Sequence, residues 1–252
     1  MKKRPFFLLS ALALLAGLLI TVAMQSANIR AGLAKPPGYF SPIIALEFAQ
    51  DTPVIRTVFK LPEVDKQAFA NRLKAIERGT DLDYLFILTY ASFMVFFALQ
   101  CKRMGQQYPW LALVFGLLAA LADVQENGQL KQIFRLVTVD QADFSAIFGP
   151  LRFWAALKFF STGAFFLALA PFFWKANGLG KGVVSTAAAA IVCWTLACFY
   201  TPETWADLLF GMTFLTFVGA MVFGLTYQVK AGLKPRLLDI LTLDTRHDPA
   251  SA

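Results

Sequence analysis

The sequence is poor in charge and has almost no histidine. Only 15% of its 252 residues are Asp, Glu, Lys or Arg, whereas soluble domains carry about 25%. The one histidine, His247, lies near the C-terminus. Composition therefore argues against a soluble globular domain, and it excludes a haem held by two histidines within a membrane.

Cysteine is equally scarce. The chain has three, Cys101, Cys193 and Cys198, and the last two lie inside an apolar run, which argues against a disulfide framework. Three cysteines and a distant histidine do not supply the four ligands of a structural zinc site. No Ser-His-Asp set, HExxH or Walker motif is present. We therefore expect no metal and no cofactor, and the sequence assigns no catalytic residue.

The chain is instead rich in long apolar segments. It is 58% hydrophobic with 26 Phe and a mean hydropathy of +0.58, and its apolar runs are long enough to cross a bilayer. These features predict an all-α, polytopic membrane helix bundle of about six transmembrane helices, with Pro171 kinking the fourth. The predicted spans are Phe6–Met24, Tyr84–Gln100, Pro109–Leu130, Leu151–Trp174, Val183–Tyr200 and Trp205–Tyr227.

The net charge of +7 indicates membrane topology and not nucleic-acid binding, because the basic residues cluster at the ends of apolar runs. With six spans and a cytoplasmic N-terminus, the basic residues of the short loops and flanks all fall on the cytoplasmic side. They are Lys102, Arg103, Lys175, Lys181, Lys230, Lys234 and Arg236. We predict a multi-pass protein of the bacterial inner (plasma) membrane, surrounded by lipid, with both termini in the cytoplasm.

Residues 1–30 are assigned to a first transmembrane helix that is retained. Met1–Arg4 is basic, as in a signal peptide, but the following apolar run is longer than a signal-peptide core. Gln25 also disrupts the small-x-small cleavage site that would end at Ala27. Residues 81–230 are assigned to a five-helix bundle, and residues 231–252 to a cytoplasmic tail with a short interfacial helix.

Residues 31–80 form a polar excursion, which we interpret as an extracytoplasmic helical insert that caps the bundle. Pro42–Gln50 is apolar with a single acid, Glu47, and is expected to lie at the membrane interface. Thr52 is the expected N-cap of a helix whose first residue is Pro53. The alternative interpretation of this cap is a binding surface for a protein partner.

Two glycine signals in the sequence predict breaks in helices. Charged and apolar residues alternate over Pro62–Arg78 and then meet Gly79, which predicts a surface helix that stops at the glycine. The run Gly178–Gly182 (GLGKG) resembles a phosphate-binding loop, but no strand precedes it and no Ser or Thr follows Lys181. We predict a cytoplasmic turn there.

The third predicted span has two chemically different faces. Small and polar residues share one side of the helix, whereas bulky aliphatic residues occupy the opposite side. The first set is Ala112, Gly116, Ala119, Ala120, Asp123, Glu126, Asn127 and Leu130, and the second is Leu113, Val114, Leu117, Leu118 and Leu121. This pattern predicts that the small face packs against other helices while the leucine face meets lipid.

The candidate site is a buried polar cluster of Asp83, Asp123, Glu126, Asn127 and Lys158. Asp83 opens the second span, the next three residues close the third on the same side, and Lys158 lies at a similar depth in the fourth. An unpaired ammonium within a membrane is costly, so we expect Lys158 to pair with Asp123 or Glu126. The cluster is either a structural clasp between three helices or a small ligand-binding pocket that opens outward.

Two short motifs around this cluster carry a resemblance. The segments Leu82–Tyr90 (LDYLFILTY) and Ala122–Asn127 (ADVQEN) resemble a loose group of uncharacterised bacterial polytopic membrane proteins. That group has an LDxLFIxxY helix start and an ADxxEN end on the next helix. The resemblance covers about a fifth of the chain and implies that these two helices pair, but it implies no activity.

These features favour an integral membrane protein that is a non-enzymatic binding, assembly or accessory component. Its polar cluster would order the bundle and hold a polar ligand or a lipid headgroup. The first alternative is a membrane-embedded enzyme that acts on a lipid or isoprenoid, with Glu126 and Asp123 as acid and base. The second is a small proton-coupled transporter. A cavity at Glu126 would favour the enzyme, and a polar path to the cytoplasm would favour the transporter.

Overall fold

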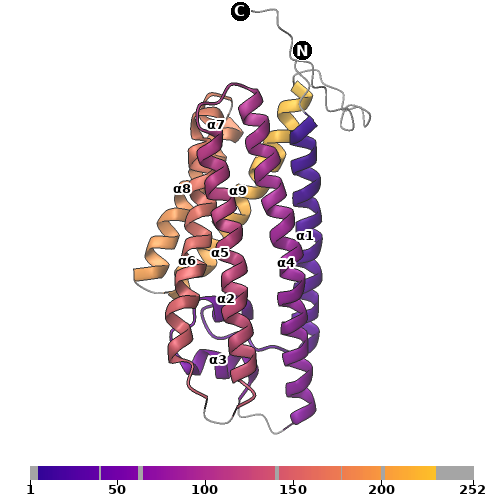
Figure 1. The fold of residues 1–252 in the computed structure, drawn as a ribbon, viewed down its shortest axis with the longest axis vertical. Coiled ribbons are helices and arrows are strands. Elements are labelled where there is room, and N and C mark those ends of the chain that lie inside the picture. Colours follow the sequence, from indigo (N-terminus) through magenta and orange to yellow (C-terminus); the bar gives the residue numbers. More distant parts are fainter. Residues whose placement is uncertain are drawn as a thin grey trace, which may run out of the picture.

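The computed structural model describes residues 5–39, 41–61, 65–139, 142–176, 178–199 and 202–230. The structure is 86% helical, and its described residues contain no strand. The tail that was predicted to carry an interfacial helix lies outside the described residues. The helices pack as an elongated bundle with two short helices at one end (Figure 1). They are α1 (Pro5–Ala31), α2 (Pro42–Glu47), α3 (Thr52–Phe59), α4 (Lys66–Arg103), α5 (Pro109–Leu136), α6 (Ser145–Ala168), α7 (Ala170–Ala176), α8 (Gly178–Phe199) and α9 (Pro202–Lys230).

Five of these helices, α1, α4, α5, α8 and α9, are long and apolar enough to cross a bilayer. They correspond to five of the six predicted spans. The remaining predicted span, Leu151–Trp174, which is the fourth along the chain, is divided between α6 and α7. Pro171 has no N–H to donate to the carbonyl of Leu167, so the helix is interrupted between Ala168 and Ala170, as the sequence led us to expect.

The predicted stop at Gly79 is wrong. Helix α4 runs without a break from Lys66 to Arg103, so the surface helix and the second span are one element. Gly79 does not adopt a positive φ and is buried within α4. An interior glycine costs about 1 kcal/mol relative to alanine, which the long apolar segment that follows outweighs. The boundary drawn at residue 80 therefore falls inside a helix.

Helices α2 and α3 lie against the end of the bundle (Figure 1). Ser41 caps α2 by accepting a hydrogen bond from the Ile43 N–H at 3.3 Å. The N-cap of α3 is Asp51 and not Thr52, because its carboxylate accepts from the Val54 N–H at 3.2 Å. Helix α2 is packed into the bundle, and its expected place at the membrane interface stays a prediction. Its residues Ile44–Glu47 are buried where α2 packs against α5, α6 and α9.

Helix α5 has the two faces that its sequence predicts. Its buried residues are Pro109, Ala112, Gly116, Ala119, Ala122, Asp123, Glu126, Asn127, Leu130, Ile133 and Phe134. On the opposite side, Val114, Leu117 and Leu121 are between 53% and 60% exposed. The small face lets α4 and α6 approach closely, and Gly116 lies against Met94 and Phe165. The polar residues of this face, Asp123, Glu126 and Asn127, are thereby buried where α5 packs against its neighbours.

The glycine run 178–182 is not a turn, since it forms the first residues of α8. A Cβ atom built on Gly180 would collide with the carbonyl oxygen of Phe173 in α7, whereas nothing lies within 4 Å of the Cβ positions of Gly178 and Gly182. Glycine is therefore required at the middle position, where α7 and α8 meet. The phosphate-loop interpretation has no support in this geometry.

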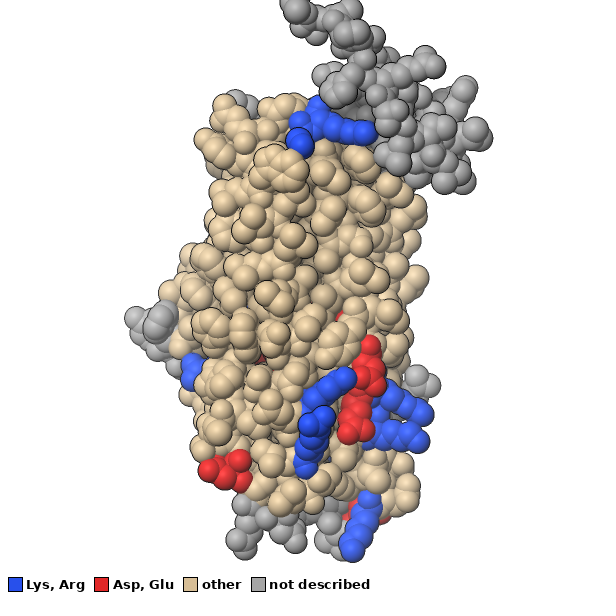
Figure 2. Space-filling view, viewed as in Figure 1, with Lys and Arg blue, Asp and Glu red and all other residues tan. Residues whose placement is uncertain are grey.

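An aromatic core fills the bundle near α7. Phe97 lies with its ring centroid 4.9 Å from Phe7 and 5.5 Å from Phe173, and Phe173 lies 5.1 Å from Phe223. These residues come from α1, α4, α7 and α9. On the face drawn in Figure 2, charged side chains lie towards the two ends of the molecule and leave an uncharged band between them.

Candidate functional site

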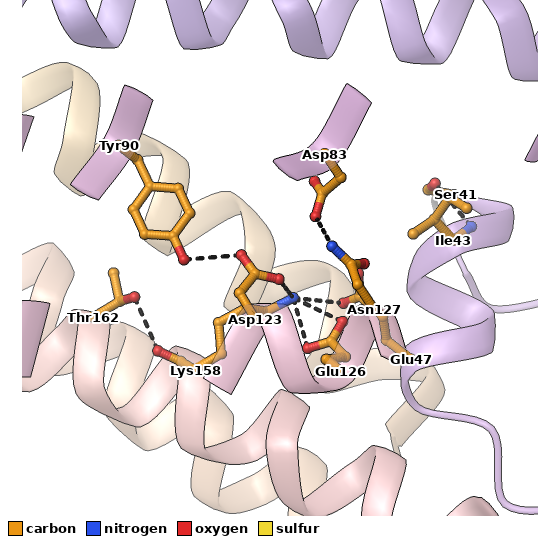
Figure 3. Close-up of polar contacts among 10 residues, drawn as sticks. All are labelled: Ser41, Ile43, Glu47, Asp83, Tyr90, Asp123, Glu126, Asn127, Lys158 and Thr162. Atoms are coloured by element: carbon orange, nitrogen blue, oxygen red, sulfur yellow. Dashed lines mark hydrogen bonds and ion pairs between the residues drawn. The ribbon is translucent and has the colours of Figure 1, made fainter. Parts of the chain in front are cut away.

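The polar cluster is assembled from four helices. Asp83 comes from α4, while Asp123, Glu126 and Asn127 come from α5. Lys158 comes from α6, and Glu47 of α2 joins them (Figure 3). The structure thus brings together all five residues that the sequence singles out, and it adds one that the sequence analysis left elsewhere.

Lys158 is the centre of this cluster. Its ammonium nitrogen lies 2.8 Å and 2.9 Å from the two carboxylate oxygens of Glu126. The same nitrogen lies 3.3 Å from Asp123 Oδ1 and 3.4 Å from Glu47 Oε2 (Figure 3). The Lys158 side chain is 13% exposed, and that of Glu126 only 1%. One buried cation therefore holds three carboxylates from two different helices, α5 and α2.

Glu47 is the residue that sequence reasoning missed as a site residue. The sequence did contain a signal, because Glu47 is the single acid of an otherwise apolar stretch. A position at the membrane interface was expected to keep this carboxylate in contact with water, so it was not assigned to the site. Burial raises the pKa of the Glu47 carboxyl above its ordinary range, while the positive charge of Lys158 opposes that shift. The contact fastens α2, and with it the cap, to the centre of the bundle.

A second set of hydrogen bonds orients the carboxylates. The Tyr90 hydroxyl donates to Asp123 Oδ2 at 2.9 Å, and Asn127 Nδ2 donates to Asp83 Oδ2 at 2.6 Å. Asp83 and Tyr90 are seven residues apart on α4, so both face α5. Thr162 donates back to the Lys158 carbonyl at 2.9 Å. The acidic groups are thus held in fixed positions by neutral donors as well as by Lys158.

A cavity of about 170 Å³ lies beside the cluster. Polar groups border it at Glu47, Asp83, Asp123 and Lys158, whereas Glu126 is not among its lining residues. Most of the remaining wall is apolar or aromatic. It comprises Leu14, Leu18, Met24, Ile43, Ile44, Phe86, Tyr90, Phe159, Phe210, Phe214 and Phe217, with Thr21, Gln25, Ser41, Thr162 and Thr213 between them.

This arrangement divides the cluster into two parts. Glu126 is buried behind Lys158 and has both oxygens against its ammonium, so it serves as the principal counter-ion. Glu47, Asp83 and Asp123 carry the carboxyls that border the cavity. Among the residues that the structure describes, no group of three His, Cys, Asp or Glu is arranged to hold a metal ion.

Comparison with protein-family models, with curated proteins and with solved structures finds no match to this chain. The resemblance carried by Leu82–Tyr90 and Ala122–Asn127 therefore stays a prediction. Both motifs do line the polar cluster, since they contain Asp83, Tyr90 and Asp123.

Proposed function

We propose that this chain is a multi-pass protein of the bacterial inner membrane that works as a non-enzymatic binding or accessory component. It holds the polar group of a ligand in the cavity beside Lys158. The observation that carries this proposal is the cavity itself, which has three carboxyls on one side and a mostly apolar wall on the others. Such a combination is typical of small-molecule sites, in which a few polar groups orient a ligand that apolar contacts retain.

The distribution of charge supports the membrane topology. Helix α6 packs against both α5 and α8. We therefore count it as a membrane span in addition to the five apolar helices, although Arg152 and Lys158 lower its hydropathy. At the α7 end, Lys102 lies over the ring of Trp110 and Lys181 over that of Trp174. Aromatic residues mark both membrane interfaces, whereas Lys and Arg of short loops mark the cytoplasmic one, so we place the α7 end on the cytoplasmic side. The cluster and the α2–α3 cap then lie towards the opposite, extracytoplasmic side.

We expect Lys66→Cys and Lys181→Cys to be labelled from opposite sides of the membrane. Both side chains are exposed, one near the cap and one near α7. The measurement is reaction with an impermeant maleimide in spheroplasts, before and after permeabilisation, in a Cys198→Ala background. Labelling of both positions from the same side would contradict the six-span arrangement.

The geometry favours binding over acid–base catalysis. The enzyme alternative uses Glu126 and Asp123 as acid and base, but Glu126 does not border the cavity and both of its oxygens contact Lys158. A general acid or base must reach the proton that it transfers. Of these two residues, only Asp123 borders the cavity, and it already accepts a hydrogen bond from Tyr90.

The geometry also favours binding over proton-coupled transport. A transporter needs a polar path that continues from the cluster towards the other side of the membrane. The interior between the cluster and α7 is instead filled by fully buried aromatic rings, among them Phe93, Phe97, Phe166 and Phe173. A pathway through these rings would require the aromatic core to repack.

Purification in native lipids followed by native mass spectrometry tests the proposed function. We expect a small molecule to co-purify with the natural chain and to be lost in Thr213→Trp, because Thr213 borders the cavity and an indole there fills it. Leu215→Trp is the matched control, since Leu215 lies on the same helix and is half exposed. Equal retention by both variants would refute binding in the cavity. The same spectra would reveal a protein partner bound through residues 31–80.

A further inference from the structure

We infer that the ligand of this cavity is an amphipathic organic cation. Its charged nitrogen lies against the carboxyls of Asp83 and Asp123, and its hydrocarbon part lies between α1 and α9. This inference rests on the proposed function and specifies the chemical class that the site takes.

The first argument is the balance of charge. Four carboxyls, those of Glu47, Asp83, Asp123 and Glu126, share the cluster with one ammonium, that of Lys158 (Figure 3). Lys158 is already in contact with three of them, so it offers little attraction to an anion such as a lipid phosphate. Asp83 and Asp123 border the cavity, and a cation there would reduce the excess of acidic groups over basic ones in this buried site.

The second argument is the aromatic wall. The ring centroid of Tyr90 lies 5.3 Å from that of Phe86 and 6.2 Å from that of Phe217. All three rings border the cavity beside the carboxyls. Aromatic faces attract cations, and the attraction is larger where water is excluded. They disfavour both a phosphate group and a strongly hydrated inorganic ion.

The third argument is the route into the cavity. Helices α1 and α9 touch near α7, where Phe7 packs against Gly224. Farther along, α9 runs away from α1 (Figure 1), and residues between Leu14 and Gln25 of α1 and between Phe210 and Phe217 of α9 border the cavity. Phe214 is 44% exposed, so one wall reaches the outer apolar surface of the bundle. A ligand with a hydrocarbon chain can therefore approach from the lipid and leave its chain between these two helices.

Equilibrium dialysis with the full chain in nanodiscs of zwitterionic lipid tests this inference. The probes are octylammonium, octanol and octanoate, which share one chain length and differ in charge, and empty nanodiscs give the background. We expect saturable binding of octylammonium that is at least about tenfold tighter than that of octanol, as one charge-assisted hydrogen bond provides. Octanoate is expected to show no saturable binding.

Variants assign the binding to the site. Asp83→Asn removes the negative charge but keeps a carbonyl oxygen that can accept the hydrogen bond from Asn127. It should weaken octylammonium binding about tenfold. Asp81→Asn is the matched control, because Asp81 is an exposed carboxylate on the same helix and pairs with Lys131 outside the cavity. Thr213→Trp should abolish binding by filling the cavity. It serves as the second variant if Asp83→Asn does not fold.

The possible outcomes separate the inference from the proposed function. If octanol or octanoate binds as tightly as octylammonium and Thr213→Trp abolishes that binding, the cavity is a binding site but the preference for a cation is refuted. An unchanged octylammonium affinity in Asp83→Asn refutes the assigned carboxyl. If no probe shows binding that Thr213→Trp removes, the inference fails. The co-purification experiment then decides separately whether the proposed function also fails.

Discussion

Replacing Lys158 by methionine is expected to lower the free energy of unfolding by roughly 3–5 kcal/mol, the usual cost of removing one partner from a buried ion pair. Methionine replaces the lysine side chain as far as Cε but leaves Glu126, Asp123 and Glu47 facing one another without a cation. These carboxyls must then take up protons or separate. Thermal and chemical unfolding of the purified protein in detergent measures the loss.

The matched control is Lys131→Met. Lys131 also forms an ion pair, with Asp81 at 2.9 Å, but this pair is exposed to solvent. Exposed pairs contribute about 1 kcal/mol or less, so this substitution should change stability little. If Lys131→Met and Lys158→Met had equal effects, burial of the cluster would not be what makes Lys158 important.

Double variants identify the principal partner of Lys158. Combining Lys158→Met with Glu126→Gln should recover part of the lost stability, because the most buried carboxylate is then neutral as well. Double-mutant cycles with Asp123→Asn and Glu47→Gln should show smaller coupling, since their oxygens lie 3.3 Å and 3.4 Å from the ammonium. Strict additivity of Lys158→Met with all three substitutions would disprove the clasp. If a double variant recovers stability but does not recover ligand binding, the cluster is a functional binding site as well as a structural ion pair.

Gly180→Ala is expected to cost about 3 kcal/mol, at the upper end of the usual range for overpacking. The added methyl group would occupy the position of the Phe173 carbonyl oxygen. The Phe173 carbonyl belongs to the backbone of α7 and cannot rotate away from the methyl group as a flexible side chain could. Helices α7 and α8 would therefore have to separate. The shift would disturb Phe173, whose ring packs against Phe97 and Phe223. Thermal unfolding in detergent checks this expectation.

Gly178→Ala and Gly182→Ala are the matched controls, since nothing lies within 4 Å of either Cβ position. Both residues are helical, so alanine should be neutral or slightly stabilising through its higher helix propensity. Equal destabilisation by all three substitutions would mean that this run needs glycine for its backbone conformation. Destabilisation of Gly180→Ala alone would assign the effect to the contact between the two helices.

Local patterns in the sequence determined the helical class and the burial of α5. Apolar length identifies the long helices because crossing a membrane requires about 20 apolar residues in a row. The two faces of α5 follow from the helical period, which places Asp123, Glu126 and Asn127 on one side whatever surrounds them. Lys158 could be matched to them in depth because a buried ammonium requires a partner.

Local stop signals were less reliable. Gly79 and the run Gly178–Gly182 were expected to end helices or form turns, yet both lie within helices. Glycine lowers helix propensity by only about 1 kcal/mol, and it is also the residue that close packing requires. Only the position of Phe173 against Gly180 shows which of these two roles applies.

The sequence by itself determined which polar residues share a helix face with small residues and so need partners, and the tertiary structure decided which of them meet. Glu47 reaches Lys158 only because α2 folds back into the end of the bundle (Figure 1), and no periodicity links residues so far apart in the chain. The cavity likewise depends on the divergence of α1 from α9 (Figure 1), which touch at Phe7 and Gly224. Periodicity describes one helix at a time, whereas an ion pair between helices and a space between them are properties of how several helices pack.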